Sequence, residues 1–211
     1  MARDGQSTRE RILEVANDLI LKQGFTATSL DQILERAGVT KGAFFYHFKS
    51  KEDLAHALFE RYLVGEAQVL EATLRRAEKL TSDPLQQVLV GLGFFEEMFA
   101  ALDSPHPGCL VASYLYEKDL MTPAILARSR EAFLVWRREI AAKLRAAAKL
   151  HPPRIALDYD ALGDLLNTVT EGAMVMSRLF DDPQIMVRQL RLMRAFIELA
   201  FGAEQAKKAA A

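Results

Sequence analysis

Apolar residues recur along nearly the whole chain at the three- and four-residue spacing of amphipathic helices. The first stripe runs from Ile12 to Ile20, and Gly24 follows it at the point where a helix would end. The alternating apolar and polar positions of a half-buried strand are nearly absent. The pattern therefore predicts an all-α fold.

Capping residues divide the next region into short helices. Ser29 is followed three residues later by Gln32, which is a capping box and predicts a helix that stops at Gly38. A second, very short helix over residues 40–48 begins at a threonine cap, and Ser50 opens a long helix.

Breaks that contain proline divide the rest of the chain. Asp83 and Pro84 mark a new helix start, with proline at the first helical position. Residues 104–108 and 151–153 interrupt the later helices. The last three helices are expected from Pro123 to about Lys149, from about Asp160 to Phe180, and from Pro183 to about Phe201. We expect about nine helices in all.

The pattern predicts two domains, a three-helix head over residues 1–52 and a larger helical body over residues 53–211. Residues 1–51 hold eight Lys and Arg against six Asp and Glu, whereas the whole chain has a net charge of −1. A weakly positive head on a negative body suits a specific nucleic-acid module, although charge alone does not establish one.

Composition excludes several classes of protein. Half of the residues are hydrophobic, which is typical of a folded globular chain and not of a disordered one. The longest nearly continuous apolar run, Val88 to Phe95, is too short to span a membrane, and the polar N-terminus has no secretory signal. A single cysteine, Cys109, fits a reducing compartment. We therefore expect a cytoplasmic protein with no membrane partner.

The segment from Thr28 to Lys51 carries the most specific pattern. Two short helices joined by a glycine-containing turn, after a longer helix, form a helix-turn-helix arrangement. In the second short helix Phe44 and Phe48 are one turn apart and are expected to face the core. Gly42 then points away from that core together with its aromatic neighbours, which would be unusual for a merely solvated face.

This outward strip predicts contacts with double-stranded DNA. Gly42 and Ala43 would let the backbone approach base edges, Phe45 would contact a thymine methyl group, and Lys41 would reach a base or a phosphate. The residues expected to hold phosphates are Tyr46, His47 and Lys51, with Thr28 and Ser29 at a helix N-terminus. A structural helical hairpin without a DNA partner would not explain the strip.

The same residues resemble the N-terminal signature of the tetracycline-repressor (TetR) family. The matching stretches are Gly24-Phe25-x-x-Thr28-Ser29, Ile33, Ala37 to Gly42, and Phe48 to Glu52. The resemblance implies a homodimeric repressor that binds a palindromic operator and is released when a small-molecule effector binds the body. The family's DNA-contacting positions fall on Lys41, Gly42, Ala43, Phe45, Tyr46, His47 and Lys51. Phe45 departs from the usual tyrosine, so its hydroxyl bond to phosphate is lost.

The two C-terminal helices predict a dimer interface. The penultimate helix carries a coiled-coil-like apolar seam, and the last helix is apolar on nearly every side. A four-helix bundle formed by these two helices from each copy would bury both. The interface is expected to include Leu166, Ala173, Met193, Phe196 and Ile197. A core helix within a monomer is the alternative.

The middle of the body is rich in aromatic residues and methionine, which suits an apolar ligand cavity or an ordinary core. The candidate ligand-binding residues are Phe95, Met98, Cys109, Tyr114 and Trp136. The segment Pro107 to Val111 resembles a Gly-Cys-Leu element of some TetR members, including ones that respond to electrophiles. Cys109 is therefore either a sensor thiol or a buried cysteine at a helix start.

No pattern predicts an enzyme, a metal site or a cofactor. The four histidines, at positions 47, 56, 106 and 151, are scattered without metal-ligand spacing, and Gly91-x-Gly93 lies inside a helical run. Three alternatives to a DNA-binding regulator of this type stay open: a ligand-binding helical protein with a non-functional head, a thiol-based electrophile or redox sensor, and a helical enzyme built around Cys109.

Overall fold

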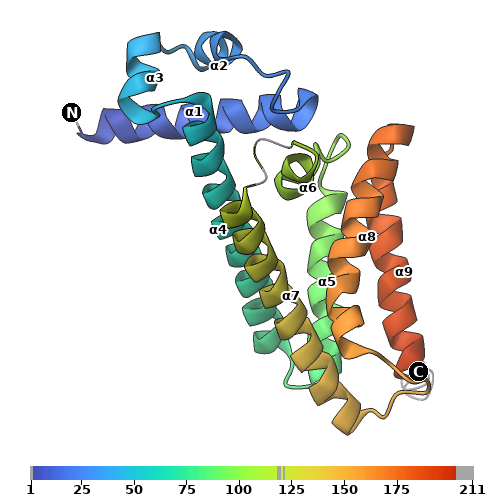
Figure 1. Ribbon diagram of the computed structural model, residues 1–211. Coiled ribbons are helices and arrows are strands. Elements are labelled where there is room, and N and C mark those ends of the chain that lie inside the picture. The colour runs from blue at the N-terminus through green and yellow to red at the C-terminus, as the bar shows by residue number, and fades with distance from the viewer. Residues whose placement is uncertain (1, 118–119, 121, 203–211) are drawn as a thin grey trace. The chain divides into compact units, whose positions relative to one another are not determined.

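The computed structural model describes residues 2–117, 120 and 122–202. Regular secondary structure in this part of the chain consists of nine α-helices, which confirms the predicted all-α fold (Figure 1). The helices are α1 (Ala2–Gln23), α2 (Leu30–Ala37), α3 (Lys41–His47), α4 (Lys51–Leu80), α5 (Pro84–Ala100), α6 (Leu110–Leu115), α7 (Pro123–Leu150), α8 (Tyr159–Phe180) and α9 (Gln184–Ala200). Among the described helices, none has the length and apolar character needed to span a membrane.

The chain forms two compact units. The first, here called the head unit, comprises Met1–Glu66 and Pro107–Ser129, and the second, the body unit, comprises Ala67–His106 and Arg130–Ala211. The head unit thus includes α1 to α3, the first half of α4, α6 and the start of α7. It extends beyond the domain boundary expected at residue 52, because a segment distant in sequence packs with the helix-turn-helix.

Local capping signals determine how the helices of the head unit begin and end. Gly24 and Gly38 have φ values of 84° and 62°, the left-handed conformation that ends α1 and α2. Ser29 forms the predicted capping box, because its hydroxyl accepts from the Gln32 amide and the Gln32 side chain accepts from the Ser29 amide. Thr40 caps α3 through its hydroxyl.

Helix α6 belongs to the core of the head unit. The Tyr114 side chain is fully buried, and its hydroxyl donates to the Ala55 carbonyl of α4 at 2.8 Å. The Tyr114 ring stacks on Phe59 of α4, with ring centroids 5.4 Å apart. Burial raises the pKa of Tyr114 above its usual range. These contacts fix α6 against the first half of α4.

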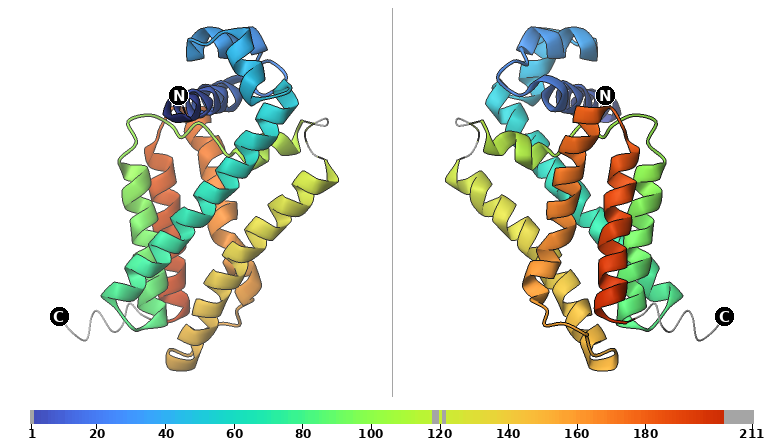
Figure 2. Two further views of the ribbon diagram at one scale, coloured as in Figure 1. Left: turned by 90° about the vertical axis from the view of Figure 1, so that its left-hand side faces the viewer. Right: turned by 90° about the vertical axis from the view of Figure 1, so that its right-hand side faces the viewer.

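The body unit is a helical bundle with a continuous apolar core. Helix α9 packs against both α5 and α8 (Figures 1 and 2). A Cβ atom on Gly163 of α8 would lie 2.6 Å from the Arg137 carbonyl oxygen of α7, so only glycine allows these two helices to approach so closely. The Arg137 guanidinium then donates to both carboxylate oxygens of Asp164, at 2.8 and 2.7 Å.

Candidate nucleic-acid interface

The short helix α3 has one buried face and one exposed face. Thr40 starts it by accepting a hydrogen bond from the Ala43 amide at 3.2 Å. Phe44 and Phe48 are 0 % and 2 % exposed, as the spacing predicted, and the centroids of their rings lie 5.5 Å apart. These two rings anchor α3 in the head unit and fix which of its residues point outward.

The outward face of α3 carries the predicted strip. Tyr46 is 83 % exposed and Phe45 is 46 % exposed, which is costly to leave in water for two adjacent aromatic rings. Lys41 and Gly42 are exposed as well. A Cβ atom on Gly42 would meet only the Thr40 hydroxyl, at 3.9 Å. Packing in this protein therefore does not require glycine there, and its effect is to leave the helix backbone open on the outside.

The remaining two residues of the strip are half-buried. Ala43 adds only a methyl group beside Gly42, so the surface stays flat over the first turn of α3. The His47 ring lies edge-on to Tyr46, with centroids 4.9 Å apart. Together with Lys41 they give this face a flat, apolar and weakly basic character.

Thr28, which was expected to help hold a phosphate at a helix N-terminus, has an internal role in the structure. It is fully buried, and its hydroxyl donates to the Gly24 carbonyl at 2.7 Å. Its position in the turn between α1 and α2 directs the side chain back to the end of α1. Ser29, by contrast, is exposed at the N-terminus of α2, beside amide groups that a phosphate could accept from.

Lys51 is also engaged within the head unit. Its ammonium donates to the Phe25 carbonyl at 2.6 Å and lies 4.0 Å from the centre of the Phe25 ring. Burial lowers the pKa of Lys51, and the charges of Glu52 and Glu117 oppose that shift. The side chain thus supports the turn between α1 and α2, whereas the sequence led us to expect an outward phosphate contact.

Two residues that support the helix-turn-helix escaped the sequence analysis. Arg11 of α1 donates from Nε to the Ala37 carbonyl at 2.9 Å, which ties the end of α2 to α1. Glu117 accepts from the Thr26 hydroxyl at 2.6 Å. No local pattern signals either contact, because the partners are 26 and 91 residues apart.

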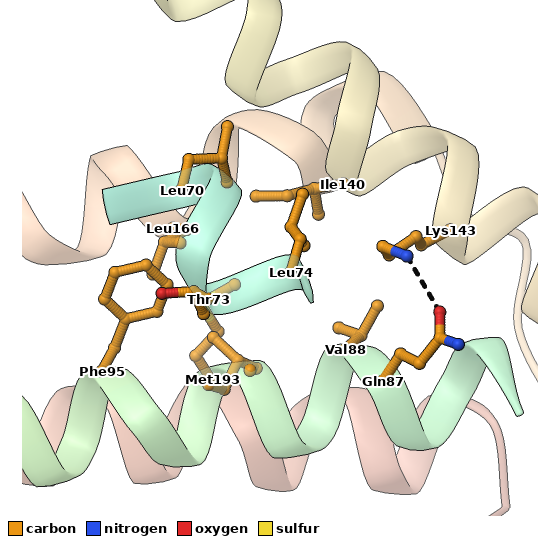
Figure 3. A pocket seen from close by; sticks show the side chains of 12 residues that line it. Leu70, Thr73, Leu74, Gln87, Val88, Phe95, Ile140, Lys143, Leu166 and Met193 are labelled. Atoms are coloured by element: carbon orange, nitrogen blue, oxygen red, sulfur yellow. Dashed lines mark hydrogen bonds between the residues drawn. The ribbon is translucent and has the colours of Figure 1, made fainter. Parts of the chain in front are cut away.

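The body unit contains an apolar cavity with a polar end. Its volume is about 30 Å³, which leaves room for about two water molecules. The polar end is formed by Lys143, whose ammonium donates to Gln87 at 2.9 Å (Figure 3). The same ammonium donates to Glu78 at 2.7 Å. The residues that line the cavity are Leu70, Thr73, Leu74, Gln87, Val88, Gly91, Leu92, Phe95, Ile140, Lys143, Leu166 and Met193.

The five predicted ligand-binding residues belong to two different units. Phe95 lines the cavity, and Trp136 packs on Phe95 with ring centroids 5.9 Å apart. Met98 is 44 % exposed, because the face of α5 that carries it points to solvent. Cys109 and Tyr114 belong to the head unit, where α6 packs against α1 and the first half of α4, and both residues are buried. The five residues are thus divided between the two units, and their grouping into one ligand site stays a prediction.

Cys109 immediately precedes α6 and is 6 % exposed. The Tyr62 hydroxyl donates to its sulfur at 3.5 Å. Burial and this contact favour a structural cysteine at a helix start, the second of the two alternatives stated above. Reagents in solution would reach this thiol slowly in the folded protein.

Most of the predicted dimer residues lie in the core of a single chain. Leu166, Ala173, Met193 and Ile197 are each at most 4 % exposed within the body unit, and only Phe196, at 40 %, is open. The sequence shows two apolar stripes on the last helix. One of them is buried and packs on α5 and α8, and the other is exposed. The exposed apolar face of the two helices consists of Val175, Met176, Leu179 and Phe180 on α8 and Leu192, Phe196 and Leu199 on α9.

Comparison with known protein families gives two matches. Residues 12–58 match the family described as "Bacterial regulatory proteins, tetR family". Residues 92–193 match a second description, "Tetracyclin repressor-like, C-terminal domain". The first covers the helix-turn-helix and the second covers most of the remaining helices.

Individual proteins of this kind are similar over part of the chain. The HTH-type transcriptional regulator AcrR of Shigella flexneri is 42 % identical over 82 residues, which is 39 % of this chain and 37 % of AcrR. The HTH-type transcriptional repressor NemR of Escherichia coli (strain K12) is 38 % identical over 71 residues, 34 % of this chain and 36 % of NemR. The alignments thus span only about a third of either relative.

Solved structures are similar over nearly the whole chain. The TetR-family regulator from Agrobacterium tumefaciens has a TM-score of 0.72 at 26 % identity, and the match covers 90 % of this chain and 97 % of that one. A TetR regulator from Chloroflexus aurantiacus J-10-FL also has a TM-score of 0.72, at 24 % identity, with 92 % and 96 % covered. At this identity the second match is evidence for the fold alone.

Proposed function

The chain belongs to the TetR family of bacterial transcriptional regulators, and from this premise we propose that it is a homodimeric, cytoplasmic repressor of transcription. It binds a palindromic DNA operator through α3, and a small-molecule effector bound in the body unit releases it. The observation that carries the DNA-binding part is the exposed strip of Gly42, Phe45 and Tyr46 on α3.

In this proposal the strip reads the major groove. Gly42 and Ala43 allow the α3 backbone to lie close to the base edges, and Phe45 contacts a thymine methyl group. Lys41 reaches a base or a phosphate, while Tyr46 and His47 hold the backbone and set the register. A small, flat surface with polar groups at its edges is better suited to contact a DNA groove than to face solvent.

The phosphate contacts are revised from those expected at first. Ser29 keeps its place at the exposed N-terminus of α2, where amide groups and the helix dipole favour an anion. Thr28 and Lys51 act indirectly, since one bonds to Gly24 and the other to Phe25. They support the turn that positions α2, and α2 in turn supports α3.

The exposed apolar face of α8 and α9 is the proposed dimer interface. Seven large apolar side chains on these two helices are each at least 40 % exposed, a concentration that a single chain in water would not favour. A second copy of the same face would cover it in a four-helix arrangement. Two-fold symmetry then requires two half-sites on the DNA, hence a palindromic operator.

The cavity of the body unit is the proposed effector site. Lys143 is already neutralised by Glu78, so an anionic ligand would leave an uncompensated negative charge beside an apolar space. A neutral, mostly apolar molecule with one hydrogen-bond acceptor fits better. Because the cavity holds only about two water molecules, binding must favour a wider state of the bundle. DNA release follows if that wider state binds the operator less well.

Selection of bound sequences from random double-stranded DNA tests the proposed function. Recovery of a two-fold symmetric sequence, bound by one dimer in a gel shift, is the expected result. Failure to enrich any sequence would favour the alternative of a ligand-binding helical protein with a non-functional head. Neutral and anionic aromatic compounds of similar size, added to the bound complex, then test the effector site.

A further inference from the structure

The turn between α1 and α2 is held by a carboxylate from a distant part of the chain. Glu117 lies just after α6, and it accepts from the Thr26 hydroxyl at 2.6 Å and from the Thr26 amide at 3.3 Å. Helix α6 contacts α1 within the head unit. One side chain thus takes two hydrogen bonds from one turn residue that is 91 positions away.

A cation at the start of α4 contacts the same turn. The Lys51 ammonium donates to the Phe25 carbonyl, and Phe25 precedes Thr26 directly. The hydrogen bond from the Thr26 side chain lowers the pKa of Glu117, and the Lys51 charge acts in the same direction. The negative and positive groups therefore support each other across residues 25 and 26.

The turn also has two local contacts, one from the last residue of α1 and one within the turn itself. Gln23 donates to the Ala27 carbonyl at 3.0 Å, and Thr28 donates to the Gly24 carbonyl. These bonds give the turn its shape but leave its attachment to the rest of the head unit to other residues. Glu117 supplies that attachment on the α6 side. The turn ends at Ser29, the N-cap of α2, so its position determines where α2 begins.

We propose that Glu117 is a positioning residue for DNA binding. Its carboxylate holds the turn at Thr26, and through α2 it keeps α3 in the orientation that fits the major groove. Operator affinity thereby depends on Glu117, a residue just after α6 and outside the helix-turn-helix. This inference rests on the proposed DNA-binding function.

Electrostatics alone predicts the opposite effect of losing Glu117. Removing a negative charge from a DNA-binding unit reduces repulsion of the phosphates and should raise affinity. Loss of the hydrogen bonds to Thr26 should lower affinity by roughly tenfold, because bonds to a charged group are stronger than neutral ones. The sign of the change therefore separates the two accounts.

The test measures the affinity of the full-length dimer for the selected operator at one salt concentration. Glu117→Ala and Thr26→Val should each bind roughly tenfold more weakly, and the double variant should bind no more weakly than either single one. Glu117→Gln keeps an acceptor for Thr26 and should recover part of the loss. Glu35→Ala, which removes an exposed carboxylate on α2, is the matched control and should not lower affinity.

Thermal unfolding of each variant separates positioning from loss of the fold. Thr26 is exposed, so Thr26→Val should melt like the wild type even if Glu117→Ala does not. Equal or tighter binding by Glu117→Ala, or additive losses in the double variant, would overturn the positioning role. If the wild type itself bound no selected DNA, the proposed function would fall, and the role of Glu117 in it as well.

Discussion

The head unit and the body unit both bury an apolar core, but they differ in what surrounds that core. In the head unit, single polar side chains bond to backbone atoms far away in sequence, as Arg11 does to Ala37 and Lys51 does to Phe25. In the body unit, helices share one continuous apolar core, and further apolar side chains on α8 and α9 remain exposed. The polar contacts to distant backbone atoms add directional constraints to the apolar core of the head unit.

This difference suits the two tasks in the proposed function. A hydrogen bond needs a defined distance and angle, so the polar contacts favour a single orientation of α2 and α3. Apolar packing is non-directional, so a bundle can repack around a ligand at moderate cost. In the proposed function, the head unit thus has the contacts expected of a precisely oriented DNA-binding element. The body unit has those expected of a bundle that adapts to a ligand.

The largest expected effect comes from adjacent residues on the two faces of α9. Met193 is 4 % exposed, whereas Leu192 is 63 % exposed. Met193→Glu buries a charge without a partner in the core and should unfold the body unit, at a cost of several kcal/mol. Leu192→Glu should leave each chain folded but separate the proposed dimer, because it places two like charges in the proposed interface.

Sedimentation and circular dichroism measured together check this pair. A Leu192→Glu variant that remains dimeric would remove the exposed face of α8 and α9 from the interface. A helical, dimeric Met193→Glu variant would instead contradict the burial of Met193 in the core of one chain.

A smaller effect separates the two lysines of the head unit. Lys41→Ala removes a cation that faces outward and should reduce the salt dependence of operator binding by about one released ion. Lys51→Ala should weaken binding with nearly the same salt dependence, because its ammonium supports the Phe25 carbonyl. Operator titrations at several salt concentrations measure both slopes. A slope lowered equally in both variants would restore Lys51 as a direct phosphate contact.

The smallest effect concerns alkaline pH. Burial raises the pKa of Tyr114 above its usual value of 10.0, so the folded state holds its proton more tightly than the unfolded state does. The stability that this provides is present below about pH 10 and is lost as the pH rises further. Tyr114→Phe should unfold with a shallower dependence on pH in that range. The free energy of unfolding is measured by urea titration at several pH values. An equal dependence of this free energy on pH in the two proteins would contradict this assignment.

The sequence predicted those features that depend on neighbouring residues. The capping box of Ser29, the threonine cap of α3 and the proline start of α5 are local, and each lies where it was expected. The buried positions of Phe44 and Phe48 follow from helical periodicity in the same way.

The features that the sequence could not predict depend on packing between distant segments. Glu117 lies 91 residues from Thr26, and nothing in its surroundings distinguishes it from other surface glutamates. In α9 two apolar stripes compete for the core, and periodicity cannot decide which one faces α5 and α8. The sequence likewise does not show that α6, which carries Tyr114, packs in the head unit, because that packing is a tertiary contact.

The central claim, that the outward face of α3 reads DNA, is tested most directly by Gly42→Leu. A side chain at Gly42 meets only the Thr40 hydroxyl in the protein itself, and glycine is a poor helix former. The variant should therefore be as stable as the wild type or about 0.5–1 kcal/mol more stable. It should nevertheless lose measurable affinity for the selected operator, because the added side chain stands where the base edges would lie. A stable Gly42→Leu protein that binds the operator as tightly as the wild type would contradict the claim.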